Sequence, residues 1–344
     1  MPEYVTLGCT GLKVSRIAFG CGFRGVTEVR DAEKTVQAAL DRGINFFDCA
    51  NKYRLRSDFP SELVLGKALR GHRENVVITS KFGAPDTVSA GNSINCSGGS
   101  RYHVIRAVER SLKQLGTDYI DVYLMHRPDS ETAFEETMSA FDQLRRDGKI
   151  LYAGLCNHSA WQLSAMQGIA KRYGSTPISV IQNAYNLLNR SPEEELLPAA
   201  AYEGVGVMAY SPLAAGLLTG VLTKGCKIPE KSTWGHNKMY KKYLKYVLSN
   251  QVTEVAQAVD EIAEGYGVAP ATVAVAWVLK NRSITSAIAG ADSVEELDGV
   301  LAACDIKLRS EDAERLDRLS HGLREDFRLP VVQQKLDYIC DKGE

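Results

Sequence analysis

An acid and a phenol lie close together in the stretch from Gly43 to Tyr53. The apolar, aromatic run at residues 44–47 predicts a short strand covered on both faces, and Asp48 ends it. Tyr53 follows in the loop beyond the strand. A carboxylate at the end of a buried strand with a tyrosine just after it could form a proton-donating pair. Alone, an Asp in this place would more often cap the next helix, so the rest of the chain must bring matching groups to the same end.

The elements that must position this pair alternate along the chain. Short apolar runs predict strands at residues 16–20, 44–49, 76–81, 120–126, 151–156, 178–183, 205–210 and 284–290. Helical periodicity fits residues 32–41, 61–69, 102–115, 133–146, 160–171, 193–202 and 294–304. Ser61, with Glu62 beside it, and Ser159 are candidate helix N-caps. This alternation predicts an α/β fold, a (β/α)8 TIM barrel with one parallel sheet.

Three features lie outside this repeat. Residues 4–15 predict an N-terminal β-hairpin. A long insertion after strand 7 carries expected helices at residues 252–266 and 271–280, and a C-terminal helix at residues 311–319 leads into a tail. No low-complexity linker divides the sequence, so we expect residues 1–344 to form a single domain.

Polar side chains end most of the predicted strands. In chain order they are Asp48, Lys81, His126, Cys156 with Asn157, Gln182 with Asn183, Tyr210 with Ser211, and Gly290. In a parallel barrel, chemistry sits at the carboxyl ends of the strands, so these groups would share one rim. Taken singly, Lys81 could be a solvated loop lysine, His126 a hydrogen-bonded core histidine and Asp48 a cap. Their gathering on one rim, with Tyr53 nearby, favours a functional site.

Composition bounds the function classes. The net charge of -1 gives no reason to expect nucleic acid or an anionic membrane as a partner. No apolar run approaches the length of a membrane span, and the first four residues lack the features of a signal peptide. The eight cysteines, at positions 9, 21, 49, 96, 156, 226, 304 and 340, form no C-x-x-C pair. We therefore expect neither a metal site nor a disulfide framework, and a cytoplasmic location.

Several motifs, taken together and in order, resemble the aldo-keto reductase superfamily. They are Asp48-x-Ala50-x-x-Tyr53, the strand at residues 77–81, and residues 118–126 ending in His126, with support from residues 61–69, 109–116 and 209–213. The likeness runs from near Leu7 to about Leu319. It implies a barrel enzyme that interconverts carbonyls and alcohols with a nicotinamide cofactor, NAD(P)(H).

The resemblance implies a catalytic tetrad of Asp48, Tyr53, Lys81 and His126. Tyr53 would donate a proton to the carbonyl oxygen as hydride reaches the carbon, and its phenolate would act as base in the reverse direction. Because a free tyrosine has a pKa of about 10, the Lys81 ammonium would be needed to lower it. Asp48 would hold Lys81 in place, and His126 would orient the carbonyl through a hydrogen bond.

The resemblance also implies the residues that hold the cofactor. Asn157 and Gln182 would bind the carboxamide of the nicotinamide, and Tyr210 would stack on its ring. Gly20 and Cys21 would lie near the nicotinamide ribose. Asp48 is also expected to contact the cofactor. Further contacts along the pyrophosphate and adenosine are expected at Ser211, Pro212, Leu213, Gly216, Gly290, Asp292 and Glu296.

The stretch after strand 8 departs from the pattern of NADP-dependent members. Asp292 stands where a basic residue would meet the 2′-phosphate, and Glu296 stands where Gln is expected. A carboxylate repels a phosphate but can accept hydrogen bonds from ribose hydroxyls, so we expect a preference for NAD(H). The rival hypothesis is that lysines of the insertion supply the missing positive charge, unless they simply form a solvated helix face. These lysines are Lys231, Lys238, Lys241, Lys242 and Lys245.

Two patterns invite other interpretations. Residues 20–25 match the G-x-G-x-x-G dinucleotide fingerprint, but the better helix start is Asp31, and a Rossmann fold would leave Lys81 and His126 unexplained. Cys49 beside the acid could be a reactive thiol only with an activating neighbour and exposure, so we expect a small buried side chain.

Loops at the expected rim point to a small polar substrate, such as a sugar, polyol or keto acid. Residues 54–60, residues 86–101, Arg127 and the tail at residues 324–328 carry arginines and amides, although these could equally face water. A second function class is a cofactor-binding regulatory subunit that senses redox state with little turnover. The intact tetrad favours catalysis, and the sequence leaves the oligomeric state open.

Overall fold

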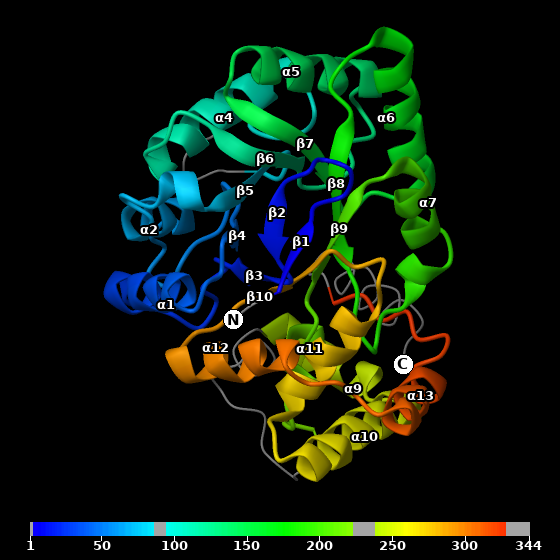
Figure 1. Ribbon diagram of the computed structural model, residues 1–344. Helices are drawn as coiled ribbons and strands as arrows, with labels where there is room; N and C mark the ends of the chain where they lie inside the picture. The colour runs from blue at the N-terminus through cyan, green and yellow to red at the C-terminus, as the bar shows by residue number, and fades with distance from the viewer. Residues whose placement is uncertain (1–2, 86–93, 223–237, 328–344) are drawn as a thin grey trace. The chain divides into compact units, whose positions relative to one another are not determined.

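The computed structural model describes residues 3–85, 94–222 and 238–327 (Figure 1). The chain divides into two compact units. The first comprises Met1–Asn183, Glu195–Ala209 and Arg282–Leu297, and the second comprises the remaining segments. The expectation that residues 1–344 form a single domain therefore stays a prediction.

The first unit is built on a closed barrel of eight strands (Figure 1). The strands are β3 (Ile17–Gly20), β4 (Phe46–Asp48), β5 (Val77–Phe82), β6 (Ile120–Met125), β7 (Ile150–Cys156), β8 (Ile178–Ala184), β9 (Gly206–Tyr210) and β10 (Ser286–Ala289). They follow the order β10-β3-β4-β5-β6-β7-β8-β9 around the barrel. Every residue of β5 and β6 is buried, because such strands have the barrel interior on one face and helices on the other. The predicted (β/α)8 barrel is confirmed.

Helices follow the strands close to the predicted ranges. They are α1 (Val29–Asp41), α2 (Ser61–Ala68), α4 (Arg101–Leu115), α5 (Phe134–Arg146), α6 (Ala160–Tyr173), α7 (Leu196–Glu203) and α12 (Val294–Leu301). Ser159 is the N-cap residue of α6, and its backbone N–H donates to the Gln162 side chain. The predicted cap at Ser61 is wrong, because Pro60 occupies the N-cap position and Ser61 is a fully buried first residue of α2.

An antiparallel hairpin precedes the barrel, as predicted. It consists of β1 (Tyr4–Thr6) and β2 (Lys13–Ser15). The Ser15 N–H donates to Asn45 Oδ1 (2.8 Å), just before β4, and the Cys9 N–H donates to the Gly204 carbonyl (2.9 Å), just before β9. The hairpin therefore contacts the amino ends of the strands, which leaves the carboxyl ends for a ligand.

The second unit is helical in its described part. It contains α9 (Lys238–Val247), α10 (Asn250–Tyr266), α11 (Pro270–Lys280) and α13 (Ser310–Leu319). Helix α10 begins at the Ser249 cap, ends at Gly267 in the left-handed conformation, and packs against α11 and α13. The Trp277 ring stacks on Tyr185 at 5.4 Å. These elements confirm the long insertion after the seventh strand and the C-terminal helix.

No single helix of the described ranges is long and apolar enough to cross a membrane. Helices α10 and α11 are long and apolar enough only when they are taken together, and the chain bends by 101° between them. The six cysteines within those ranges are free, and no group of three His, Cys, Asp or Glu there could hold a metal ion.

Candidate active site

The four expected catalytic residues lie at the carboxyl ends of three neighbouring strands of the first unit. Asp48 is the last residue of β4, Lys81 is the penultimate residue of β5, and His126 directly follows β6. Tyr53 lies in the loop after β4. Since these strands are parallel and adjacent, the four side chains share one rim.

The Lys81 ammonium is the centre of this cluster. Its Nζ donates to both carboxylate oxygens of Asp48 (2.8 Å each) and to the Cys49 carbonyl (2.7 Å), and lies 3.5 Å from the Tyr53 hydroxyl. Lys81 is 0% exposed and Asp48 is 3% exposed. Burial alone would lower the pKa of Lys81, but the charges of Asp48 and Tyr53 raise it overall. Lys81 is therefore a fixed cation.

Burial raises the pKa of Tyr53 above its ordinary value. The Lys81 ammonium lowers this pKa, as expected, yet it offsets the burial only in part. The expected net lowering is therefore wrong, because sequence gives the charged neighbour but not the degree of desolvation. Tyr53 keeps its proton at neutral pH, which suits a proton donor.

His126 faces Tyr53 across the site. The two rings lie 5.8 Å apart, nearly perpendicular at 78°. Burial, followed by the charges of Lys81, Lys52 and Arg127, lowers the pKa of His126 well below its usual value. The imidazole is thus neutral, and a neutral ring has one N–H to donate. Its buried Nδ1 has no hydrogen-bond partner among the described residues.

Asp48 also connects β4 to two other strands. Its Oδ1 accepts hydrogen bonds from Thr79 Oγ1 on β5 (2.5 Å) and from Gln182 Nε2 on β8 (2.8 Å). Sequence reasoning missed Thr79. Because side chains alternate along a strand, Thr79 must share the strand face of Lys81, two residues on. This spacing is the signal that could have revealed it.

The two expected carboxamide ligands lie beside this network. Asn157 has a left-handed backbone (φ 64°), and its Nδ2 donates to the His126 carbonyl at 2.8 Å. The Gln182 amide is fixed by Asp48, which leaves Oε1 facing the weakly donating Cys156 thiol at 3.6 Å. The structure therefore brings both amides to the tetrad, while their role stays a prediction.

Gly20, Cys21 and Gly290 also lie beside Asp48. Gly20 pairs with Asp48 in the β3–β4 register, and the Cys21 N–H donates to the Asp48 carbonyl at 2.8 Å. A Cβ atom on Gly290 would stand only 3.0 Å from the Gly20 carbonyl oxygen. The three backbones thus form one surface next to the tetrad.

The third glycine of the G-x-G-x-x-G pattern does not open a helix, because α1 begins only at Val29. Instead, Gly25 contacts Asp292: its N–H donates to the Asp292 carboxylate, and a Cβ atom here would overlap Asp292 Oδ2. The Asp292 N–H in turn donates to Glu296 Oε2 at 2.9 Å. The Rossmann interpretation is therefore wrong. The Asp292 carboxylate binds the Gly25 N–H in the loop after β3, and the Glu296 carboxylate binds the Asp292 N–H just before α12.

The remaining expected cofactor residues belong to the second unit, and they are Tyr210, Ser211, Pro212, Leu213 and Gly216. The segment after Tyr210 is strained: Ser211 has φ 54°, Ala214 φ 50° and Ala215 φ 57°, and Gly216 follows at φ 100°. Asn186 Nδ2 donates to the Ser211 carbonyl (2.9 Å) and fixes the turn. Non-glycine residues with positive φ cluster at functional segments. The cofactor contacts expected here, at Pro212 and Leu213 as well, stay predictions.

Some expected features lie partly outside the described residues. Residues 86–93, Lys231 and Arg328 are among them, and so is the Lys245 side chain. Lys238, Lys241 and Lys242 are exposed on α9, as a solvated helix face requires. Cys49 is fully buried, and burial raises the pKa of its thiol well above the usual value, so this thiol is not activated.

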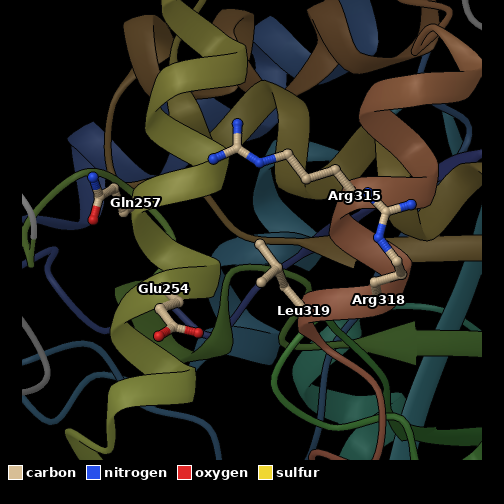
Figure 2. Close-up of a pocket in the computed structure, with 5 residues that line it drawn as sticks. All are labelled: Glu254, Gln257, Arg315, Arg318 and Leu319. Atoms are coloured by element: carbon tan, nitrogen blue, oxygen red, sulfur yellow. The ribbon is translucent and has the colours of Figure 1, made fainter.

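A cavity of about 400 Å³ lies in the second unit between α10 and α13 (Figure 2). It is lined by Glu254, Gln257, Arg315, Arg318 and Leu319. None of the expected catalytic residues lines it, so the candidate site at the barrel rim and this cavity are separate features.

The model of the aldo/keto reductase family matches residues 16–321. The chain belongs to the aldo/keto reductase family. It is 36% identical to a Bacillus subtilis protein named uncharacterized oxidoreductase YrpG, over 93% of this chain and 96% of that protein. A putative aryl-alcohol dehydrogenase of Schizosaccharomyces pombe is 35% identical, over 92% and 95% of the two chains. A probable voltage-gated potassium channel subunit beta of Arabidopsis thaliana is 34% identical, over 88% and 92%.

Proposed function

We propose that this aldo/keto reductase is an NAD(P)(H)-dependent oxidoreductase that interconverts a carbonyl and an alcohol by hydride transfer. The observation that carries the proposal is the buried Lys81 ammonium, held between the Asp48 carboxylate and the Tyr53 hydroxyl. In this arrangement Tyr53 is the general acid for carbonyl reduction, and its phenolate is the base for alcohol oxidation.

The residues present fit a nicotinamide cofactor. The buried Asn183 Oδ1 lacks a hydrogen-bond partner within the described ranges, as expected where a ligand supplies one. Asn157 and Gln182 would hold the carboxamide, and Gly20 would border the ribose. The bound cofactor would supply or accept the hydride.

The chain's own residues divide the remaining work. His126, neutral at physiological pH, donates a hydrogen bond that orients the substrate carbonyl. Tyr53 passes its proton to the carbonyl oxygen, and Lys81 stabilises the phenolate that remains. Because the pKa of Tyr53 is raised, the resting enzyme holds this proton and is prepared for reduction.

Removal of the Tyr53 hydroxyl tests the proposal. General acid catalysis contributes about 100- to 10,000-fold, so Tyr53→Phe should lower kcat for carbonyl reduction by that factor while NADH still binds. The matched control is Tyr202→Phe, since Tyr202 is 87% exposed on α7. Unchanged turnover in Tyr53→Phe would refute the assignment.

We further propose a preference for NAD(H). Asp292 and Glu296 occupy the Gly25 and Asp292 N–H groups, which a 2′-phosphate would otherwise need. Two carboxylates there also repel a phosphate. The positive charges of Arg24 and Arg56 act on Asp292 in the opposite sense.

Titration with NADH and NADPH, followed by tryptophan fluorescence, tests this preference. The wild-type protein should bind NADH more tightly, and Asp292→Lys should shift the ratio of the two Kd values towards NADPH. The matched control is Asp147→Lys, because Asp147 is the exposed C-cap residue of α5, a helix that follows β6, whereas Asp292 follows β10. Tighter NADPH binding by the wild type would overturn the preference and favour the lysine-rich insertion as the phosphate site.

The relatives named potassium channel subunit beta raise an alternative, a cofactor-binding regulatory subunit with little turnover. Steady turnover of any carbonyl or alcohol would decide for the enzyme. Cofactor binding without turnover, for a broad panel of carbonyls, would favour the regulatory role.

The substrate we propose is small and polar, such as a sugar, polyol or keto acid. The exposed Arg127, which directly follows His126, supports this, whereas Arg54 Nη1 already donates to the Asn51 and Tyr53 carbonyls and Arg56 Nε to the Arg24 carbonyl. We also propose a cytoplasmic location, consistent with the free cysteines of the described chain.

A further inference from the structure

Two cations flank the proposed catalytic groups. Lys52 directly precedes Tyr53, Arg127 directly follows His126, and both side chains are exposed. The Tyr53 and His126 rings lie 5.8 Å apart on the same rim. The chain therefore places one cation next to each of the two side chains that would contact the substrate carbonyl.

The charges of these two cations reach each other and the site. Partial burial and then the Arg127 charge lower the pKa of Lys52, although solvent damps the effect because Lys52 is exposed. Both cations also contribute to the lowered pKa of His126. Lys52 and Arg127, each bonded to the residue that carries one of the two facing rings, thus place two like charges on the same rim.

No carboxylate of the described chain forms an ion pair with either cation. Elsewhere in the first unit the pattern is different, because Arg73 contacts Asp121 at 2.7 Å and Lys81 contacts Asp48 at 2.8 Å.

The acid whose pKa responds to Arg127 is Asp129. Its carboxylate already accepts hydrogen bonds from the Gly99 N–H (2.8 Å), the Thr132 hydroxyl (2.6 Å) and the Glu131 N–H (2.9 Å). Asp129 is therefore bound by its own loop and by Gly99, and it forms no ion pair with Arg127 among the described residues.

We propose that Lys52 and Arg127 form an anion subsite, and that the natural substrate carries a carboxylate or phosphate group near its reacting carbonyl. This inference rests on the proposed carbonyl chemistry at Tyr53. An anion would relieve the repulsion between the two cations and form charge-assisted hydrogen bonds with both. Its position beside Tyr53 and His126 would also fix which carbonyl reaches the proton donor.

Matched pairs of charged and neutral aldehydes test the subsite. The carboxylate pair is 4-oxobutanoate and its methyl ester, and the phosphate pair is glyceraldehyde 3-phosphate and glyceraldehyde. The purified protein should reduce at least one charged member with a kcat/KM about tenfold or more above its neutral partner.

Variants locate the effect. Lys52→Gln and Arg127→Gln should each raise KM for the charged substrate about tenfold, with a smaller change for the neutral one. Arg70→Gln is the matched control for net charge, because Arg70 is an exposed cation beyond the end of α2. It should preserve the preference.

The outcomes separate the possible failures. A preference confined to one pair identifies the anion as carboxylate or phosphate. Turnover of neutral aldehydes with equal or higher kcat/KM, insensitive to Lys52→Gln and Arg127→Gln, overturns the anion subsite and leaves the carbonyl chemistry intact. If the protein turns over none of the four compounds, wild-type protein is titrated with succinate and with inorganic phosphate. Binding that weakens in both variants supports the subsite, and no binding refutes it.

Discussion

Asp48→Asn should destabilise the protein strongly, because it removes the counter-ion of a buried cation. Lys81 is 0% exposed, and two of its four polar contacts are the Asp48 oxygens at 2.8 Å. Without the carboxylate, the ammonium keeps the Cys49 carbonyl and the Tyr53 hydroxyl. Breaking a buried pair from one side costs about 3–5 kcal/mol, a large share of a typical stability of about 5–15 kcal/mol.

Urea unfolding at pH 7, followed by circular dichroism, measures this loss. Asp48→Asn should lower the free energy of unfolding by about 3–5 kcal/mol. The double variant Asp48→Asn/Lys81→Met removes the unpaired charge and should recover more than about 1 kcal/mol of it. Asp147→Asn, at an exposed site, should change stability by less than about 0.5 kcal/mol.

The reasoning is refuted if Asp48→Asn costs less than about 1 kcal/mol, or if the double variant is less stable than the single one. The first result would mean that the Lys81 charge is solvated or lost in the folded protein. The second would mean that the Lys81 side chain stabilises the barrel without Asp48.

Three other predictions follow from burial. Gly66→Ala should destabilise the protein, because a Cβ atom there would overlap the Leu115 backbone. Gly168 lies on α6 with open space around it, so Gly168→Ala should stabilise the protein by about 0.5–1 kcal/mol in the same urea assay. Burial lowers the pKa of His158 to about 4, below the value of about 6.5 for an unfolded chain, so this histidine destabilises the fold as the pH falls below about 6.5. The free energy of unfolding should drop by about 2 kcal/mol between about pH 7.5 and pH 5. His158→Phe should remove that part of the pH dependence. Cys49 should not react with a thiol reagent in the native protein but should react after unfolding in urea, and rapid native labelling would contradict its burial.

The barrel could be predicted from the sequence because its signals are local. Each strand is a short apolar run, and polar residues such as Asp48 and His126 mark where the runs stop. Parallel pairing then places those ends on one rim without further information. The same reasoning extends to Thr79, two residues before Lys81 on the same strand face.

Other features depend on contacts that sequence does not reveal. The pKa of Tyr53 is the sum of burial and charge, and only the charged neighbour was visible in the sequence. Ser61 has the chemistry of a cap, yet the turn through Pro60 places it one residue inside the helix, where it is buried. The contact of Gly25 with Asp292 joins distant parts of the chain. A glycine pattern that is typical of a Rossmann fold therefore occurs here in a (β/α)8 barrel.

That contact also has an evolutionary consequence. Because a Cβ atom at position 25 would overlap Asp292 Oδ2, a larger residue there requires the Asp292 side chain to turn away and to give up the Gly25 N–H. Among related sequences, a larger residue at position 25 should therefore occur more often together with a shorter or differently directed residue at position 292. The two positions should covary although they lie far apart in the sequence.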